Sequence, residues 1–166
     1  FYSIARFPHP LTPLKEEANQ DCIRAYLRSC DFLDPPLERV NVECGGKSIV
    51  SHFRAPAGSG PDNPAPAVLI MCGGDMFKED RGWAGEMAME NGLASLVMDG
   101  PATGENPFPH EPESVKAWMA AIDYLAARPE VDGARIGAFG ISRGGHSVML
   151  LAGSYPGGVR CAVASA

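Results

Sequence analysis

The sequence has no run of lysine and arginine, no apolar stretch long enough to cross a membrane and no CxxC pair. The formal net charge is −6, and the basic residues are scattered along the chain. Proteins that bind nucleic acid or a membrane surface usually gather their basic residues into a patch. A transmembrane helix needs about 20 predominantly apolar residues in a row. We therefore expect a protein that contacts neither nucleic acid nor a membrane.

Cysteine is sparse and odd in number, with five residues in the whole chain. Cys72 and Cys161 lie inside apolar runs, where a thiol behaves as a small hydrophobic group. This usage does not suggest a disulfide framework. We expect the protein to work in a reducing compartment, the cytoplasm.

Histidine is scarcer still, and the four histidines are His9, His52, His110 and His146. None of them has the spacing to a cysteine, an aspartate or a second histidine that zinc sites show. A zinc site is therefore not expected. His146 follows the serine discussed below by four residues, and we expect it to pack or hydrogen-bond there rather than to act as a base.

The sequence does contain a regular alternation of apolar runs and helical patterns. A helix is predicted over 12–33, with Thr12 as its cap, and two strands over 37–56 around a turn at Gly45-Gly46. Buried strands are then predicted at 67–74, 93–100, 134–140 and 159–166, and helices at 81–92, 111–130 and 144–155. This alternation indicates an α/β fold with a mostly parallel sheet and flanking helices.

A serine stands between glycines where the strand predicted at 134–140 ends. The stretch reads Gly140-Ile141-Ser142-Arg143-Gly144, which is G-x-S-x-G in a strand–turn–helix context. That context is typical of a nucleophile elbow, a sharp turn in which side chains at Gly140 and Gly144 would collide with neighbouring backbone. The stretch has neither the G-x-G-x-x-G of dinucleotide sites nor the G-K-[ST] of phosphate loops. A plain strand-to-helix turn is the alternative interpretation.

Three motifs together resemble the α/β-hydrolase superfamily: "GGDMFKED" (73–80), "DGPATGEN" (99–106) and "GISRGG" (140–145). They are most similar to the fermentation-respiration switch protein-like esterases, a branch that includes dihydroxypseudooxynicotine hydrolase and fungal hydrolases that shorten polyketides. The resemblance covers roughly residues 37–166. It implies that 1–36 is a helical, cap-like segment and that 37–166 is the N-terminal part of an α/β-hydrolase domain.

The resemblance implies a serine hydrolase that acts on a small-molecule acyl substrate with an ester, a thioester or an activated carbon–carbon bond. Ser142 would attack the carbonyl carbon, a histidine would take its proton and an acid would orient that histidine. The backbone N–H of Arg143 and that of Gly74 or Asp75 would hold the oxyanion. No metal or organic cofactor would be needed. The alternative hypothesis, from a different functional class, is an α/β-hydrolase-like binding or regulatory module without catalytic activity.

The order of the catalytic groups raises a question about the end of the chain. In α/β-hydrolases the acid and then the histidine follow the serine. After Ser142 this sequence has no Asp or Glu, and its only histidine is His146. The apolar run at 159–166 is also typical of an interior strand. We therefore expect the C-terminal part of the domain to lie outside these residues; a homodimer, or completion by a second fragment of the same protein, stays open.

Several further residues have ordinary structural interpretations. Asp99 and Glu105 are expected to stabilise a turn, although Glu105 could also contact the substrate. Trp83 and Trp118 lie on predicted helix faces and are expected in the core. The charged "KED" at 78–80 is interpreted as the solvated start of a helix.

Overall fold

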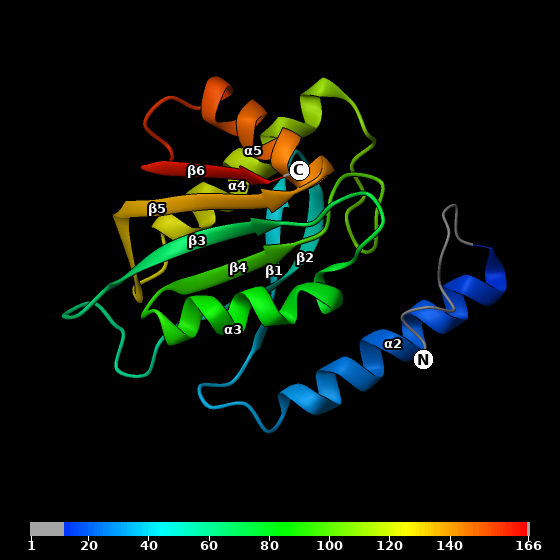
Figure 1. Ribbon diagram of the computed structural model, residues 1–166, viewed down its shortest axis with the longest axis horizontal. Coiled ribbons are helices and arrows are strands. Elements are labelled where there is room, and N and C mark those ends of the chain that lie inside the picture. The colour runs from blue at the N-terminus through cyan, green and yellow to red at the C-terminus, as the bar shows by residue number, and fades with distance from the viewer. Residues whose placement is uncertain (1–11, 166) are drawn as a thin grey trace.

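The computed structural model describes residues 12–165, and the predicted α/β architecture is confirmed (Figure 1). The part of the predicted N-terminal segment before Thr12 lies outside the described residues. The described elements, in chain order, are α2 (Pro13–Cys30), β1 (Glu38–Cys44), β2 (Lys47–Arg54), β3 (Ala65–Met71), η1 (Lys78–Arg81), α3 (Gly82–Glu90), β4 (Ala94–Met98), η2 (Pro112–Ser114), α4 (Val115–Ala126), β5 (Val131–Ile141), α5 (Arg143–Ser154) and β6 (Cys161–Ser165).

One sheet holds all of these strands, in the order β1-β2-β4-β3-β5-β6. Strand β3 pairs in parallel with β4 and β5, and β5 pairs in parallel with β6. The hairpin β1–β2 joins β4 in antiparallel fashion, so the sheet is mixed but mostly parallel. Because β3, β4, β5 and β6 are parallel, their carboxyl ends meet at one edge, where ligands bind in sheets of this kind.

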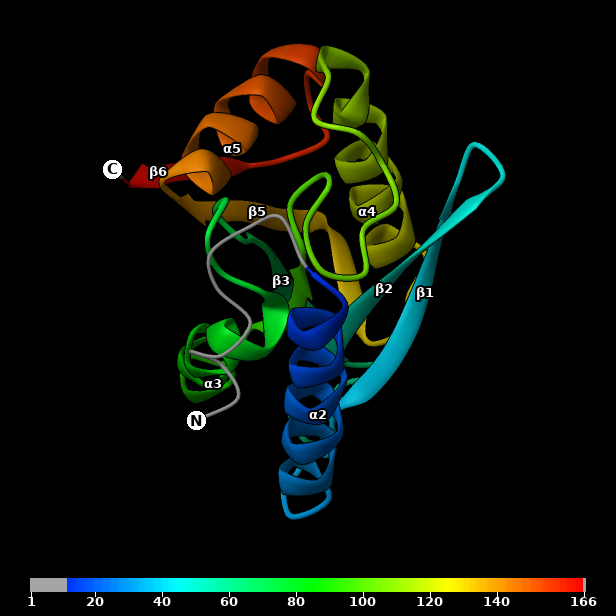
Figure 2. The ribbon, with the colours of Figure 1, turned by 90° about the vertical axis from the view of Figure 1, so that its right-hand side faces the viewer.

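Helices cover the two faces of the sheet unequally (Figure 2). Helices α4 and α5 lie on one face, and they pack there against alternate residues of the strands, such as Leu69 and Met71 of β3. The intervening Ile70 faces α3 on the other side, as the period of two along a strand requires. This larger core on the α4 and α5 side fixes the strand ends from which the candidate site is built.

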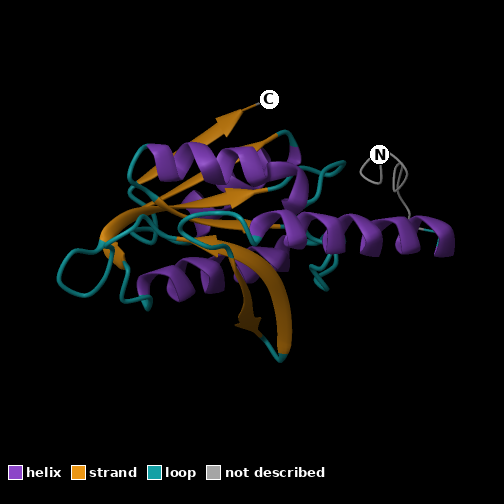
Figure 3. Cartoon of the chain, turned by 90° about the horizontal axis from the view of Figure 1, so that it is seen from below, coloured by secondary structure: helices purple, strands orange, loops and turns teal. Residues whose placement is uncertain are grey.

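Helix α2 runs beside the sheet and extends beyond it (Figure 3). As predicted for the cap, the hydroxyl oxygen of Thr12 accepts a hydrogen bond from the backbone N–H of Lys15 at 3.4 Å. Pro13 occupies the first turn, where its missing N–H costs no hydrogen bond. Among the described residues, no helix combines the length and the apolar character that crossing a membrane requires.

The last described strand lies at the edge of the sheet. Within residues 12–165, β6 is an edge strand that pairs only with β5, and all five of its residues are exposed. Its apolar sequence therefore leaves side chains such as that of Val163 in contact with solvent.

Candidate functional site

Ser142 is the single residue between the end of β5 and the start of α5, and its side chain is exposed. Its backbone has φ 58° and ψ −125°. Residues other than glycine rarely adopt a positive φ, because the Cβ atom then crowds the backbone. The backbone N–H of Ser142 donates to the carbonyl oxygen of Ser165 at 2.8 Å, which ties the turn to β6. This strained strand-to-helix turn is the geometry that the G-x-S-x-G pattern predicts.

The two glycines of the pattern are required by close backbone contacts. A Cβ atom at Gly140 would lie 2.3 Å from the carbonyl oxygen of Gly144. A Cβ atom at Gly144 would lie 2.3 Å from the carbonyl oxygen of Met71, at the end of β3. Neither distance is compatible with a side chain, so the glycines allow α5 to approach β3 and β5 closely enough to form the elbow.

The loop after β3 lies directly beside the elbow. A Cβ atom at Gly73 would be 3.6 Å from the Cβ of Ser142 and 3.2 Å from the carbonyl oxygen of Ile141. Gly74 follows, and the side chain of Arg143 lies against it. The structure thus brings the predicted donors Gly74 and Asp75 to the same sheet edge as Ser142. Their role as oxyanion donors stays a prediction.

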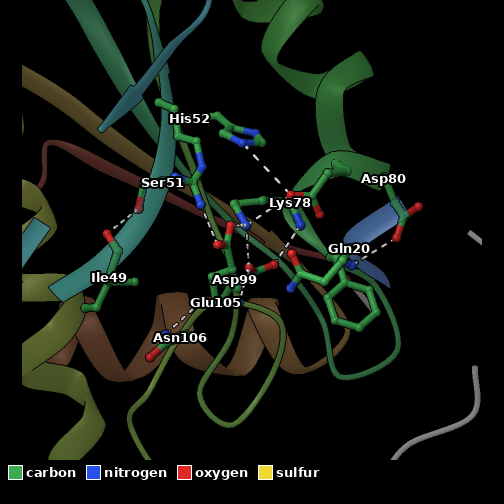
Figure 4. Close-up of polar contacts among 12 residues, drawn as sticks. Gln20, Ile49, Ser51, His52, Lys78, Asp80, Asp99, Glu105 and Asn106 are labelled. Atoms are coloured by element: carbon green, nitrogen blue, oxygen red, sulfur yellow. Dashed lines mark hydrogen bonds and ion pairs between the residues drawn. The ribbon is translucent and has the colours of Figure 1, made fainter. Parts of the chain in front are cut away.

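The interpretation of "KED" as a solvated helix start is wrong. The Lys78 side chain is fully buried and Glu79 is buried too, while Asp80 is half-buried. Lys78 Nζ lies 3.0 Å from Asp99 Oδ2, 3.0 Å from Glu79 Oε1 and 2.7 Å from Glu105 Oε2 (Figure 4). Lys78 is therefore the cation at the centre of a buried cluster of carboxylates, which we call the Lys78 cluster (Lys78, Glu79, Asp99 and Glu105).

The Lys78 cluster joins the loop after β3 to the loop after β4. Asp99 Oδ1 accepts a hydrogen bond from the backbone N–H of Lys78 at 2.7 Å, and its Oδ2 accepts one from the backbone N–H of Glu105 at 3.0 Å. The side-chain amide of Asn106 donates to the Asp99 carbonyl oxygen at 2.9 Å. A Cβ atom at Gly100 would be 3.3 Å from the carbonyl oxygen of Cys72, so the two loops are in close contact. Asp99 and Glu105 thus have the structural role that the sequence predicts.

Burial and charge set the protonation of this region. Burial alone would lower the pKa of Lys78, but the carboxylates around it, Asp99 first, raise that pKa above its ordinary value. Burial raises the pKa of Glu79, and the charge of Lys78 partly opposes this. Burial and the charges of Lys78 and Arg39 lower the pKa of His52 to about 3. His52 is therefore neutral at ordinary pH, and it stacks on the ring of Tyr26 with the ring centroids 5.3 Å apart.

The other histidines do not form a metal site within the described chain. His9 lies outside the described residues, and the side chains of His110 and His146 are exposed. The backbone N–H of His146 donates to the Ser142 carbonyl oxygen at 3.2 Å, while the side chain makes no hydrogen bond within residues 12–165. No group of three His, Cys, Asp or Glu side chains in residues 12–165 could hold a metal ion.

The prediction for the two tryptophans is confirmed for one of them. Trp118 of α4 is 2% exposed and packs in the main core. Trp83 is 46% exposed on α3, with the guanidinium of Arg81 5.8 Å from the centre of its ring. The prediction of a core position is wrong for Trp83, which lies at an open apolar groove between α3 and the sheet and stays in contact with solvent.

The family model described as "Esterase FrsA-like" matches residues 1–165 of this chain. The chain belongs to the FrsA-like esterase family. It is 28% identical to 2,6-dihydropseudooxynicotine hydrolase of Paenarthrobacter nicotinovorans over 137 residues, which cover 81% of this chain and 36% of that protein. It is also 28% identical to esterase FrsA of Vibrio cholerae over 156 residues, which cover 92% of this chain and 37% of the relative.

Solved structures of similar proteins agree with the fold. AbyA5 superposes with a TM-score of 0.82 at 26% identity, covering 94% of this chain and 43% of that one. The structure of 2,6-dihydroxy-pseudo-oxynicotine hydrolase gives a TM-score of 0.78 at 25% identity, covering 88% of this chain and 42% of that one. The α/β-hydrolase fold and the resemblance drawn from the three motifs are confirmed. The chain spans only 36% of the length of the hydrolase of Paenarthrobacter nicotinovorans and 37% of the length of esterase FrsA of Vibrio cholerae.

Two features of the site could not be predicted from the sequence. One is the burial of Lys78, which depends on carboxylates that lie 21 and 27 positions further along the chain. The other is the direction of the Arg143 side chain toward Gly74. Both result from contacts between segments that follow different strands, and no local pattern reports such contacts.

Proposed function

We propose that this chain carries the nucleophile and the oxyanion-binding backbone of a serine hydrolase of the FrsA-like esterase family. The observation that supports this most directly is the strained, exposed Ser142 beside Gly73-Gly74 at the carboxyl edge of the sheet. The bond cleaved is an ester bond, a thioester bond or an activated carbon–carbon bond in a small molecule. We place the protein in the cytoplasm, because its five cysteines form no disulfide.

In the proposed reaction, Ser142 Oγ attacks the carbonyl carbon and forms a tetrahedral intermediate. The negative oxygen is held by the backbone N–H of Arg143 and by that of Gly74 or Asp75. The carbon–oxygen double bond re-forms, the leaving group departs with a proton, and water then hydrolyses the acyl-enzyme. A histidine accepts the Ser142 proton and an acid orients it. Between Ser142 and Ala166 the sequence offers His146 and no acid.

A fluorophosphonate probe tests the proposal directly. We expect the whole protein, as its gene encodes it, to be labelled covalently, and mass mapping to place the label on Ser142. Only a serine whose hydroxyl is activated reacts readily with such a probe. A folded whole protein that stays unlabelled would favour the module without catalysis instead.

Replacement of Gly144 with valine is expected to lower the stability of the fold by about 3 kcal/mol and to abolish labelling. The Cβ position is set by the backbone, so no rotamer avoids the Met71 carbonyl oxygen at 2.3 Å. Gly153→Val in the same helix is the matched control, because nothing lies within 4 Å of that Cβ position. Thermal unfolding of both variants checks the prediction, and equal melting temperatures would contradict it.

A further inference from the structure

The side chain of Arg143 lies on the loop that borders the nucleophile. A Cβ atom at Gly74 would be 2.5 Å from Cζ and Nη2 of Arg143 and 2.8 Å from Nε. The guanidinium therefore rests against the Cα of Gly74, in space that only a glycine leaves open. The neighbouring Gly73 has its Cβ position 3.6 Å from the Cβ of Ser142. The guanidinium and the nucleophile thus flank the same Gly73-Gly74 dipeptide.

Among the residues that the structure describes, no carboxylate pairs with the guanidinium of Arg143. Five other arginines bind carboxylates of the chain, namely Arg24, Arg39, Arg54, Arg128 and Arg135. Within residues 12–165, the Arg143 side chain makes neither an ion pair nor a hydrogen bond. Its N–H groups remain available at the mouth of the site, and the residue is exposed.

The charges around the dipeptide are arranged asymmetrically. Asp75 Oδ1 lies 3.6 Å from the Cβ position of Gly73, so a negative charge stands on the Gly73 side and a positive one on the Gly74 side. A negatively charged group of a bound substrate is therefore repelled by Asp75 on the Gly73 side and attracted by Arg143 on the Gly74 side. A guanidinium presents two parallel N–H donors that match the two oxygens of a carboxylate.

We propose that Arg143 binds a carboxylate of the substrate that lies a short distance from the carbonyl attacked by Ser142. The preferred substrates are then acyl compounds that carry a carboxylate near the scissile bond. This inference rests on the proposed function, and it assigns the Arg143 side chain a role separate from that of its backbone N–H.

The test compares anionic esters with neutral esters of the same shape in the whole protein. Monoethyl malonate, succinate and glutarate are each paired with the ethyl keto ester of equal length, in which a methyl ketone replaces the carboxylate. Ethanol release gives kcat/KM for each ester. We expect the anionic member of at least one pair to be preferred, and Arg143→Met to lower that preference about 10- to 100-fold, the range of a charge-assisted hydrogen bond. Arg143→Lys should retain part of this preference, because lysine keeps the positive charge but lacks the two parallel N–H donors of a guanidinium.

Arg28→Met is the matched control, because Arg28 is an exposed arginine on α2 and the substitution removes the same charge. It should leave the ratio of anionic to neutral kcat/KM unchanged. A ratio that Arg143→Met alters less than twofold would overturn the inference. The measured quantity is a ratio of kcat/KM values. A change at the Arg143 backbone N–H would alter the turnover of anionic and neutral esters alike, so it would leave this ratio unchanged.

The failure of this inference is distinguishable from failure of the proposed function. Absence of labelling and of hydrolysis that depends on Ser142 would overturn the catalytic proposal. Calorimetric binding of the unreactive succinate monoamide, compared with its keto amide analogue, tests Arg143 without turnover. Tighter binding of the anionic amide that Arg143→Met abolishes supports the inference, and equal binding to both proteins overturns it.

Discussion

Substitution of Ser142 by alanine is expected to abolish hydrolysis and to leave the fold intact. Loss of the nucleophile in serine hydrolases with the same chemistry costs on the order of a million-fold in turnover. The fold should tolerate the change, because the contact that ties Ser142 to β6 comes from its backbone N–H, which alanine retains. Alanine at φ 58° meets the same crowding of its Cβ as serine does. The measurement is turnover of a p-nitrophenyl ester by the whole protein, together with its melting temperature.

Ser154→Ala provides the control for this variant, because Ser154 is an exposed serine at the other end of the same helix. It should keep both turnover and fluorophosphonate labelling. If Ser142→Ala retained turnover within tenfold of the parent, the nucleophile would have to be sought elsewhere. A loss of activity accompanied by unfolding would show that the turn, rather than the hydroxyl, had been lost.

The elbow could be predicted from the sequence because its requirements are local. The glycines, the serine and the change from a strand pattern to a helix pattern all fall within residues 134–155. A sharp turn that brings a helix back onto its own sheet needs small residues at fixed positions, so the spacing itself carries the information. The order of strands and helices was predictable for a similar reason, because the periods of apolar residues differ between the two.

The Lys78 cluster could not be predicted in this way. A lysine followed by two acidic residues is typical of an exposed helix start, and the sequence alone offers no reason to bury it. Its burial depends on Asp99 and Glu105, which follow another strand and meet Lys78 only when β3 and β4 pair in parallel. The same holds for Arg143, whose side-chain direction depends on the absence of a side chain at Gly74.

The second large effect is expected from the replacement of Lys78 with methionine. Methionine has a similar length, so it fills the space but leaves the carboxylates of Asp99, Glu79 and Glu105 without their shared cation. Breaking a buried ion pair by removing one partner typically costs about 3 to 5 kcal/mol, because the remaining charge stays buried. We expect a loss of this size in the free energy of unfolding, measured with urea at pH 7. Lys116→Met is the control, since its contact with Glu113 joins side chains that are 65% and 81% exposed; it should change stability by about 0.5 kcal/mol or less.

The loss of unfolding free energy caused by Lys78→Met should also depend on pH. The direction of that dependence follows from the pKa of Glu79. Burial raises the pKa of Glu79 and Lys78 opposes that rise, so removal of Lys78 raises this pKa further. The folded variant then holds a proton at pH values where the unfolded chain, with an ordinary glutamate pKa of about 4.3, has released it. A folded state that binds more protons loses stability as the pH rises. The deficit in unfolding free energy relative to the parent should therefore be smallest at about pH 4.5 and grow toward pH 7. A deficit below about 1 kcal/mol at pH 7, or one that does not change with pH, would show that the Lys78 cluster is not held together by its buried cation.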